Sequence, residues 1–157
     1  MSFTAKLRRE AEDLLTDYTI AIDDGALERW PGYFADPCLY KIVSRENVDS
    51  GLPLALLLCD SPGMLQDRAD AFAKLNVFAP RIWRHMTGPV RLTADGKLTR
   101  ARSNFVIFET LSGQNTHVLC AGEYCDVLVH QAGALKFAER ICIYDTTMIP
   151  NSIVMPI

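Results

Sequence analysis

Apolar side chains recur at helical spacing in the first part of the chain. Between residues 5 and 24 they fall three or four positions apart, and acidic side chains take most of the other positions of the helical wheel. The members of this apolar stripe are Leu7, Ala11, Leu14, Leu15, Tyr18 and Ile22. The pattern predicts an amphipathic helix over residues 5–24 that ends at Gly25, because glycine readily adopts the left-handed conformation that often follows a helix.

Two further helices are predicted before residue 80. A short helix over residues 26–34 is interrupted by Pro31 and Gly32, so the pattern leaves its local geometry open. Ser61 and Pro62 resemble an N-cap and a first helical position, and a new apolar stripe follows them down to Pro80. That stripe consists of Leu65, Ala69, Phe72, Leu75 and Phe78. Between these helices, residues 38–43 have a β-like pattern, and residues 47–60 are interpreted as a loop followed by a strand.

After Pro80 the chain changes to long β-rich runs separated by turn residues. Turn signals at residues 95–96, 112–115 and 131–134 divide this part into four antiparallel strands joined by hairpins. Helices followed by a meander of strands are typical of an α+β domain, in which the helices cover one face of a curved antiparallel sheet. Since no linker or internal repeat is visible, residues 1–157 are expected to form one domain.

The predicted strand over residues 116–130 is apolar on both of its faces. An antiparallel sheet with one wet face alternates apolar and polar positions, yet both alternating sets of this strand are largely apolar. We expect the helices to cover one face and another chain to pack on the other, with scattered surface apolar residues as the alternative. The apolar tail over residues 150–157 is likewise expected to dock, either on a partner or on its own chain.

Composition excludes several classes of protein. The formal net charge is -3 and the 16 Lys and Arg residues are scattered, which argues against binding to nucleic acid. The longest purely apolar run, residues 52–59, is too short to cross a membrane, so no membrane partner is expected. The N-terminal segment lacks an apolar h-region and the five cysteines form no CxxC pair, so we expect reduced thiols and a cytoplasmic location.

The sequence offers little material for a metal or cofactor site. If His117 and His130 share one unbulged strand, their odd separation puts them on opposite faces, where they cannot bind one ion together. Neither they nor His85 follow a cysteine by two or three positions, which excludes Rieske-type ligation. The number of histidines does not rule out a mononuclear iron site of two histidines and a carboxylate, although no spacing in the sequence supports one. The dispersed glycines form no phosphate-binding loop, so we expect no catalytic, cofactor-binding or metal-binding residue.

Several short segments, spread in order along most of the chain, resemble the small (beta) subunits of aromatic-ring-hydroxylating dioxygenases. The residues that carry this resemblance are Asp24, Leu27, Arg29 and Trp30; Phe34, Asp36 and Tyr40; Met64, Leu65, Asp67 and Arg68; Arg81, Trp83, Arg84 and His85; Ser103, Asn104, Phe105 and Val106; Gly122, Glu123, Tyr124 and Asp126; and Glu139, Arg140 and Asp145. The chain departs from the family pattern at Gly88 and Pro89, which interrupt an extended run, and at Pro31 and Gly32.

The resemblance implies a cystatin-like cone, in which N-terminal helices pack on a strongly curved sheet. It also implies a hexamer of three large and three small subunits, in which the small subunits associate as a trimer. The large (alpha) subunit would hold a Rieske 2Fe-2S cluster and a mononuclear Fe(II) and would dihydroxylate the ring with O2 and electrons from NADH. The benzoate, anthranilate, salicylate and terephthalate branch is most similar. The small subunit would have a structural role.

This structural role makes subunit interfaces the candidate functional sites. The expected interface residues are Arg84, His85, Arg100, Arg102, Asn104, Glu123, Asp126, Arg140, Met155 and Ile157. A stand-alone isomerase or dehydratase, working by acid–base catalysis in an apolar pocket of the same cone, is the alternative. Its candidate residues are Tyr18, Asp36, His85, His117, Tyr124 and Asp126. A ligand-binding homodimer without catalytic activity is a third hypothesis.

Overall fold

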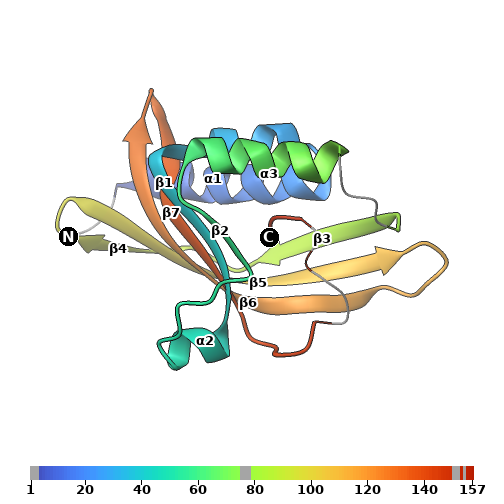
Figure 1. The fold of residues 1–157 in the computed structure, drawn as a ribbon. Coiled ribbons are helices and arrows are strands. Elements are labelled where there is room, and N and C mark those ends of the chain that lie inside the picture. Colours follow the sequence, from blue (N-terminus) through green and yellow to red (C-terminus); the bar gives the residue numbers. More distant parts are fainter. Residues whose placement is uncertain (1–3, 75–78, 150–152, 154) are drawn as a thin grey trace.

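The computed structural model describes residues 4–74, 79–149, 153 and 155–157, which form a layer of helices over a curved sheet. Helices α1 (Ala5–Asp23) and α3 (Pro62–Lys74) lie on one side of the sheet, and the short α2 (Arg45–Asp49) lies on the other (Figure 1). We call the side of the sheet toward α1 and α3 the inner face and the opposite side the outer face. No helix among the described residues is long and apolar enough to cross a membrane.

The amphipathic patterns predicted α1 and α3 correctly. In α1 the Thr4 side chain accepts a hydrogen bond from the Leu7 backbone N–H, and the stripe from Ala11 to Ile22 is buried. The Ser61 hydroxyl caps α3 by accepting a hydrogen bond from the Met64 N–H at 3.3 Å. Leu65 and Ala69 of α3 are buried, while Leu75 and Phe78 of the predicted stripe lie outside the described residues.

The residues around Pro31 and Gly32 form a 3-10 helix, η1 (Leu27–Tyr33), instead of an α-helix. Pro31 lacks the N–H that an α-helix would use there, which favours the short, tightly wound form. The side chains of Leu27 and Trp30 point into the core from this segment and are buried.

One sheet contains all of the strands among the described residues. They are β1 (Phe34–Ser44), β2 (Leu57–Cys59), β3 (Arg81–Thr87), β4 (Arg91–Asp95), β5 (Leu98–Leu111), β6 (His117–Gln131) and β7 (Ala134–Tyr144). Their order is β2-β1-β7-β6-β5-β3, with β4 paired to β5 beyond β3. The three predicted turns join β4 to β5, β5 to β6 and β6 to β7. The sheet is mixed, because β1 pairs parallel with β7 and all other pairs are antiparallel.

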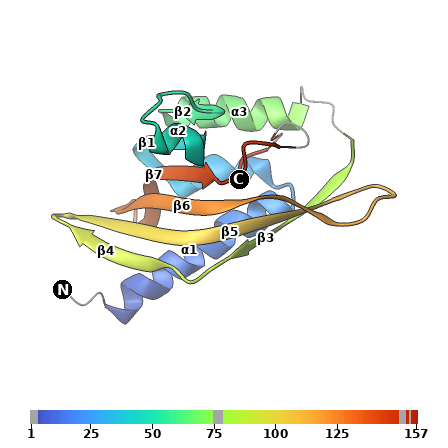
Figure 2. The same cartoon turned by 90° about the horizontal axis from the view of Figure 1, so that it is seen from below.

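The first predicted strand of the meander is divided in two. Both β3 and β4 pair with β5, and Gly88, Pro89 and Val90 separate them. The Gly88 N–H still donates to the Asn104 carbonyl at 2.9 Å, but Pro89 has no N–H with which to continue the ladder. The meander therefore has five strands where the pattern predicted four, and β3 and β4 diverge along one edge (Figure 2).

Aromatic side chains form the centre of the core between α1, η1 and the inner face. The Tyr18 ring contacts the Phe137 ring edge-on, with centroids 5.5 Å apart, and Trp30 packs against Tyr40 with centroids 5.0 Å apart. Phe34 joins the same cluster. The inner face is therefore closed by this chain alone.

Substitution of Gly122 tests how tightly the centre of the sheet is packed. A Cβ added at this position would overlap the backbone carbonyl of Ile143 on β7, which cannot move away without breaking the ladder. We expect Gly122→Ala to lower the free energy of unfolding by about 3 kcal/mol, as over-packed cores do. Urea unfolding followed by tryptophan fluorescence measures the change. Gly32→Ala is the control, because a Cβ there meets nothing within 4 Å. Equal stability of both variants would contradict the close packing.

Candidate functional site

The outer face carries half of the expected interface residues. In the register of the sheet, Arg84 lies opposite Phe108, Asn104 opposite Glu123, and Arg102 opposite Cys125. These positions alternate with the buried Trp83, Phe105 and Tyr124 of the inner face. Arg84, Arg100, Arg102, Asn104 and Glu123 therefore all point away from α1 and α3.

One end of the outer face is apolar and exposed. We call Ile82, Met86 and Val118 the apolar patch, and these side chains are 54%, 63% and 52% exposed. Met86 lies opposite Val106, and Val118 lies opposite Phe108, so β5 connects the patch across the sheet. Exposed apolar side chains that gather in one place on a protein surface often mark an interaction site.

An ion-pair cluster occupies the middle of the outer face. Arg45, the first residue of α2, contacts the Glu123 Oε1 through Nη1 at 2.7 Å, and Arg102 pairs with the Glu123 Oε2. Arg45 also contacts Asp145 at 3.3 Å. Burial alone raises the pKa of Glu123, but the hydrogen bonds and charges of both arginines outweigh it and lower the pKa below its ordinary value.

A hollow of about 320 Å³ lies at the other end of the outer face, beside β4. Val127 and Ile141 contribute apolar surface to it, and Arg91, Arg100 and Arg102 bring cationic side chains. Arg100 pairs with Asp95 at 2.7 Å, whereas none of the described residues forms an ion pair with Arg91. Glu139 and Asp126 also line the hollow, so it offers apolar surface next to both cationic and acidic residues.

Four of the expected interface residues lie in the interior instead. Arg140 and Asp126 are fully buried and form an ion pair with an Nη1–Oδ2 distance of 2.8 Å. The Arg140 guanidinium lies over the Tyr124 ring, 3.7 Å from its centroid, and over the Tyr18 ring at 4.2 Å. Loss of hydration raises the pKa of the Asp126 carboxyl to about 7, although Arg140 opposes this shift. In the single chain, neither side chain of this pair is exposed.

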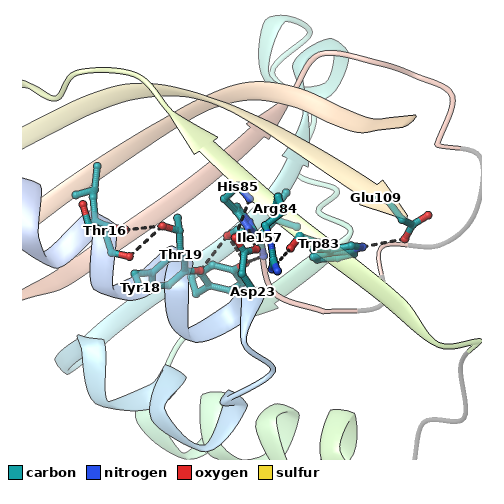
Figure 3. A network of polar contacts seen from close by, with 11 residues as sticks. Thr16, Tyr18, Thr19, Asp23, Trp83, Arg84, His85, Glu109 and Ile157 are labelled. Atoms are coloured by element: carbon teal, nitrogen blue, oxygen red, sulfur yellow. Dashed lines mark hydrogen bonds and ion pairs between the residues drawn. The ribbon is translucent and has the colours of Figure 1, made fainter. Parts of the chain in front are cut away.

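His85 is the third interior residue, and its partner was not predicted. Its Nδ1 lies 2.6 Å from the Asp23 Oδ1, and its backbone N–H donates to the Asp23 Oδ2 at 2.9 Å (Figure 3). Asp23 ends α1, while His85 lies in β3, so only the packing of α1 on the sheet brings the two together. The His85 side chain is fully buried.

Ile157 is the fourth interior residue, and the tail docks on its own chain. Ile157 is 0% exposed, and its main-chain oxygen accepts a hydrogen bond from the Tyr18 hydroxyl at 2.9 Å (Figure 3). The same oxygen accepts a second hydrogen bond from the Tyr40 hydroxyl at 3.1 Å. Met155 is half-buried and packs against the same core. This is the intrachain arrangement that the sequence left open, and it makes Ile157 unavailable to a partner.

Comparison with known proteins shows the family. Residues 4–141 match the model of the SnoaL-like domain. Over 138 residues the chain is 35% identical to the anthranilate 1,2-dioxygenase small subunit of Burkholderia cepacia, covering 87% of this chain and 85% of that one. The chain belongs to the dioxygenase small subunits. It is also 30% identical over 141 residues to the beta 2 subunit of the terephthalate 1,2-dioxygenase terminal oxygenase from a Comamonas species, covering 89% of this chain and 92% of that one.

A solved structure from the same family confirms the fold. The chain is 37% identical to a protein of Novosphingobium aromaticivorans assigned as the beta subunit of an aromatic-ring-hydroxylating dioxygenase. The two superimpose with a TM-score of 0.86, covering 96% of this chain and 97% of that one. The predicted cystatin-like α+β fold and the resemblance to dioxygenase small subunits are therefore confirmed.

In this small subunit, the six acid–base candidates do not converge on one site. Asp36 is exposed near the start of β1, and its backbone N–H donates to the Gln131 side chain. His117 faces the buried Glu109 at 3.4 Å, at the opposite end of β6 from His130. Tyr18, His85, Tyr124 and Asp126 are interior, and Tyr18 bonds to Ile157. These placements favour the structural role over the isomerase or dehydratase alternative.

His117 and His130 would lie on opposite faces only in an unbulged strand, and β6 does not meet this condition. Cys120 lies opposite Ile107 but Val118 lies opposite Phe108, so β6 carries one extra residue at Leu119. Such a bulge reverses the alternation and turns both histidines toward the inner side. His130 pairs with Glu10 of α1 at 3.1 Å, far along the strand from His117. Among the described residues, no group of three or more His, Cys, Asp or Glu side chains is placed to hold a metal ion.

Because the pKa of Glu123 is lowered in the folded chain, the free energy of unfolding should decrease as the pH falls into the acidic range. Its ordinary value is 4.5, so the ionised side chain stabilises the fold above that pH, and the contribution is lost as the pH falls through the lower value of the folded chain. We expect Glu123→Gln to cost about 1–2 kcal/mol at pH 7 and much less at pH 3. Urea unfolding at both pH values measures this. Glu28→Gln, at an exposed position, is the control, and an equal cost of Glu123→Gln at both pH values would contradict the assignment.

Proposed function

We propose that this small subunit binds a Rieske-type large subunit and further copies of itself through its outer face, within a hexamer of three large and three small subunits. The observation that carries the proposal is the contrast between the two faces of the sheet. The inner face is closed by α1, η1 and the tail, whereas the outer face combines the apolar patch, paired charges and the hollow. A scaffold subunit needs such a surface, and a catalytic one would need an open interior.

The apolar patch supports burial against another protein. Ile82, Met86 and Val118 are each more than half exposed, and covering them would remove apolar area from water. The partly buried Val106 and Phe108 on β5 extend the same surface. We assign this patch to the centre of a subunit contact, in which Arg84, between Ile82 and Met86 on the same face of β3, would pair with a partner carboxylate.

The charged residues of the outer face support specificity in that contact. Glu123 is held by two arginines before any partner arrives, so its burial leaves no unpaired charge. Arg84 and Arg91 are exposed and form no ion pair with a described residue. They require carboxylates from the partner, which would select among chains by charge complementarity.

We infer that the complex acts on a carboxylated aromatic ring. The relatives described above are named for anthranilate and terephthalate, and both of these compounds carry a carboxyl group on an aromatic ring. We place the choice of ring, the Rieske 2Fe-2S cluster and the mononuclear Fe(II) in the large subunit. The five cysteines of this chain are free, which is consistent with a reducing compartment such as the cytoplasm.

Co-expression with the Rieske-type large subunits of the same organism tests the proposal. We expect one of them to co-purify with this chain as a hetero-oligomer of the size of three large and three small subunits, measured by light scattering during size exclusion. Replacing either Met86 or Val118 alone by Glu should weaken assembly by about 30-fold or more, because charge at the centre of an interface removes a hot spot.

The matched control is Ile20→Glu, which places the same charge on the exposed side of α1, where Ile20 is 49% exposed. It should leave assembly unchanged. Failure of every large subunit to co-purify, or equal disruption by Ile20→Glu, would contradict the proposed interface.

A further inference from the structure

A row of exposed leucines lies along one edge of the sheet. Leu52, Leu54, Leu56 and Leu58 belong to β2 and to the segment that leads into it from α2, and they are 49%, 70%, 52% and 42% exposed. We call these four residues the leucine row. Among the described strands β2 pairs only with β1. Free edges are usually protected by charged side chains, so a row of leucines at this edge indicates a contact with another protein.

Unpaired acidic side chains flank the leucine row. Glu46 and Asp49 of α2 precede it, Asp60 follows it, and residues 46–60 contain no Lys or Arg. All three acidic residues are exposed, and none of the described residues forms an ion pair with them. Arg45 beside them is held in the ion-pair cluster of the outer face, which leaves Lys41 on β1 as the cation next to the row. The flank therefore carries an excess of negative charge.

The opposite edge of the sheet carries the complementary surface. The strand order begins at β2 and ends at β3, so the leucine row and the apolar patch are separated by the width of the sheet (Figure 2). On β3 the exposed Arg84 lies between Ile82 and Met86 of the patch and forms no ion pair with a described residue. One edge thus combines apolar side chains with unpaired carboxylates, and the other combines them with an unpaired guanidinium.

A hollow beside the apolar patch can receive a leucine side chain. Its volume is about 300 Å³, and Val118 of the patch lines it together with Met148. Met148 is 83% exposed, so apolar surface continues from the patch across the hollow. Asp145 also lines the hollow, but its carboxylate is paired with Arg45. Leu54 is the most exposed member of the leucine row and is the side chain that can enter such a hollow.

We propose that the leucine row of one copy of this chain binds the apolar patch of a second copy, with Leu54 in the hollow at Val118 and the acidic flank facing Arg84. The opposite charges of the two edges favour a second copy over the large subunit as the partner of the row. Each chain carries both surfaces at opposite ends of its sheet, so the contact is head-to-tail and closes into a ring. A ring of three supplies the small subunits of the proposed hexamer, and this inference rests on that part of the proposed function.

The test uses the chain alone and two variants that each lose one surface. Leu54→Glu keeps an intact patch, and Met86→Glu keeps an intact leucine row. The unchanged chain should have the mass of a trimer by light scattering during size exclusion, and each variant alone should associate at least about 30-fold more weakly. Both side chains are more than half exposed, so both variants should unfold at the temperature of the unchanged chain.

Mixing the two variants shows whether the contact is head-to-tail. The Leu54→Glu chain, labelled with a fluorophore at its N-terminus, should bind the Met86→Glu chain saturably in fluorescence anisotropy. The complex should stop at two copies, because each of its two free surfaces carries the added glutamate. The labelled chain should not bind unlabelled Leu54→Glu chain. Ile20→Glu, on the exposed side of α1, is the matched control and should form trimers like the unchanged chain.

The charge match has a separate readout. Adding Arg84→Glu to the Leu54→Glu chain should weaken its binding to the Met86→Glu chain by about tenfold. Replacing Glu46, Asp49 and Asp60 by Lys in the Met86→Glu chain should then recover the affinity. Recovery distinguishes a direct charge contact from a general loss of the surface, and its absence would overturn the pairing of Arg84 with the acidic flank.

An unchanged chain that stays monomeric, a Leu54→Glu chain that still forms trimers, or a mixture that does not bind would overturn the proposal. If Leu54→Glu instead abolishes co-purification with a large subunit and leaves self-association intact, the leucine row binds the large subunit. Co-purification of the unchanged chain with a large subunit is measured independently of these mixtures. Failure of the head-to-tail contact is therefore distinguishable from failure of the proposed function.

Discussion

Helices α1 and α3 cover one face of the sheet, and the side chains of the other face must meet either water or a second chain. The two faces answer this constraint differently. The inner face is filled by aromatic rings from α1, η1, β1 and β7, and its buried Arg140 and Asp126 side chains pair with each other within the chain. The outer face keeps Ile82, Met86 and Val118 in water and ties its central carboxylate, Glu123, to arginines. Because the chain covers the inner face with its own helices, only the outer face of the sheet is available for contact with another protein. A supporting subunit needs this arrangement.

Closure of the interior also limits the chemistry of the chain. The Arg140–Asp126 pair combines a fully buried cation and carboxylate, and such a pair costs more hydration than it regains unless further contacts surround it. Here the Tyr18, Tyr124 and Phe137 rings lie against the guanidinium and supply those contacts. Breaking the pair would leave an uncompensated charge in the core. Asp126 and Tyr18, which the sequence offered as acid–base candidates, are therefore structural members of the core.

The periodicity of apolar residues predicted the features that depend on neighbouring residues and missed the contacts between residues far apart in the sequence. The stripes of α1 and α3, the three hairpin turns and the apolar character of both faces of β6 all follow from neighbouring residues. The alternation of side chains in β6 already placed Glu123 and Asp126 on opposite faces of the strand. It could not show which face points toward the helices, so both residues were assigned to the interface. The Asp23–His85 contact spans 62 residues and depends on how α1 crosses β3. The bulge at Leu119, which reverses the facing of His117, leaves no composition signal. The parallel pairing of β1 with β7 is more remote still, since Tyr40 lies opposite Arg140, 100 residues later in the chain.

Some charged side chains of the outer face already form ion pairs within the chain, and others do not. Glu123 retains only a small exposed fraction and is bound by Arg45 and Arg102, yet the Arg102 side chain is still 67% exposed. A partner carboxylate can therefore join Arg102 without displacing Glu123. Arg91 borders the same hollow and forms no ion pair with a described residue, so burial without a partner carboxylate would cost the full hydration of its charge. In the proposed contact, apolar area at the patch would supply affinity, and Arg91 would disfavour any chain that lacks an acidic residue at the hollow. Selectivity for the correct subunit would then come from the unfavourable burial of this charge against a wrong partner.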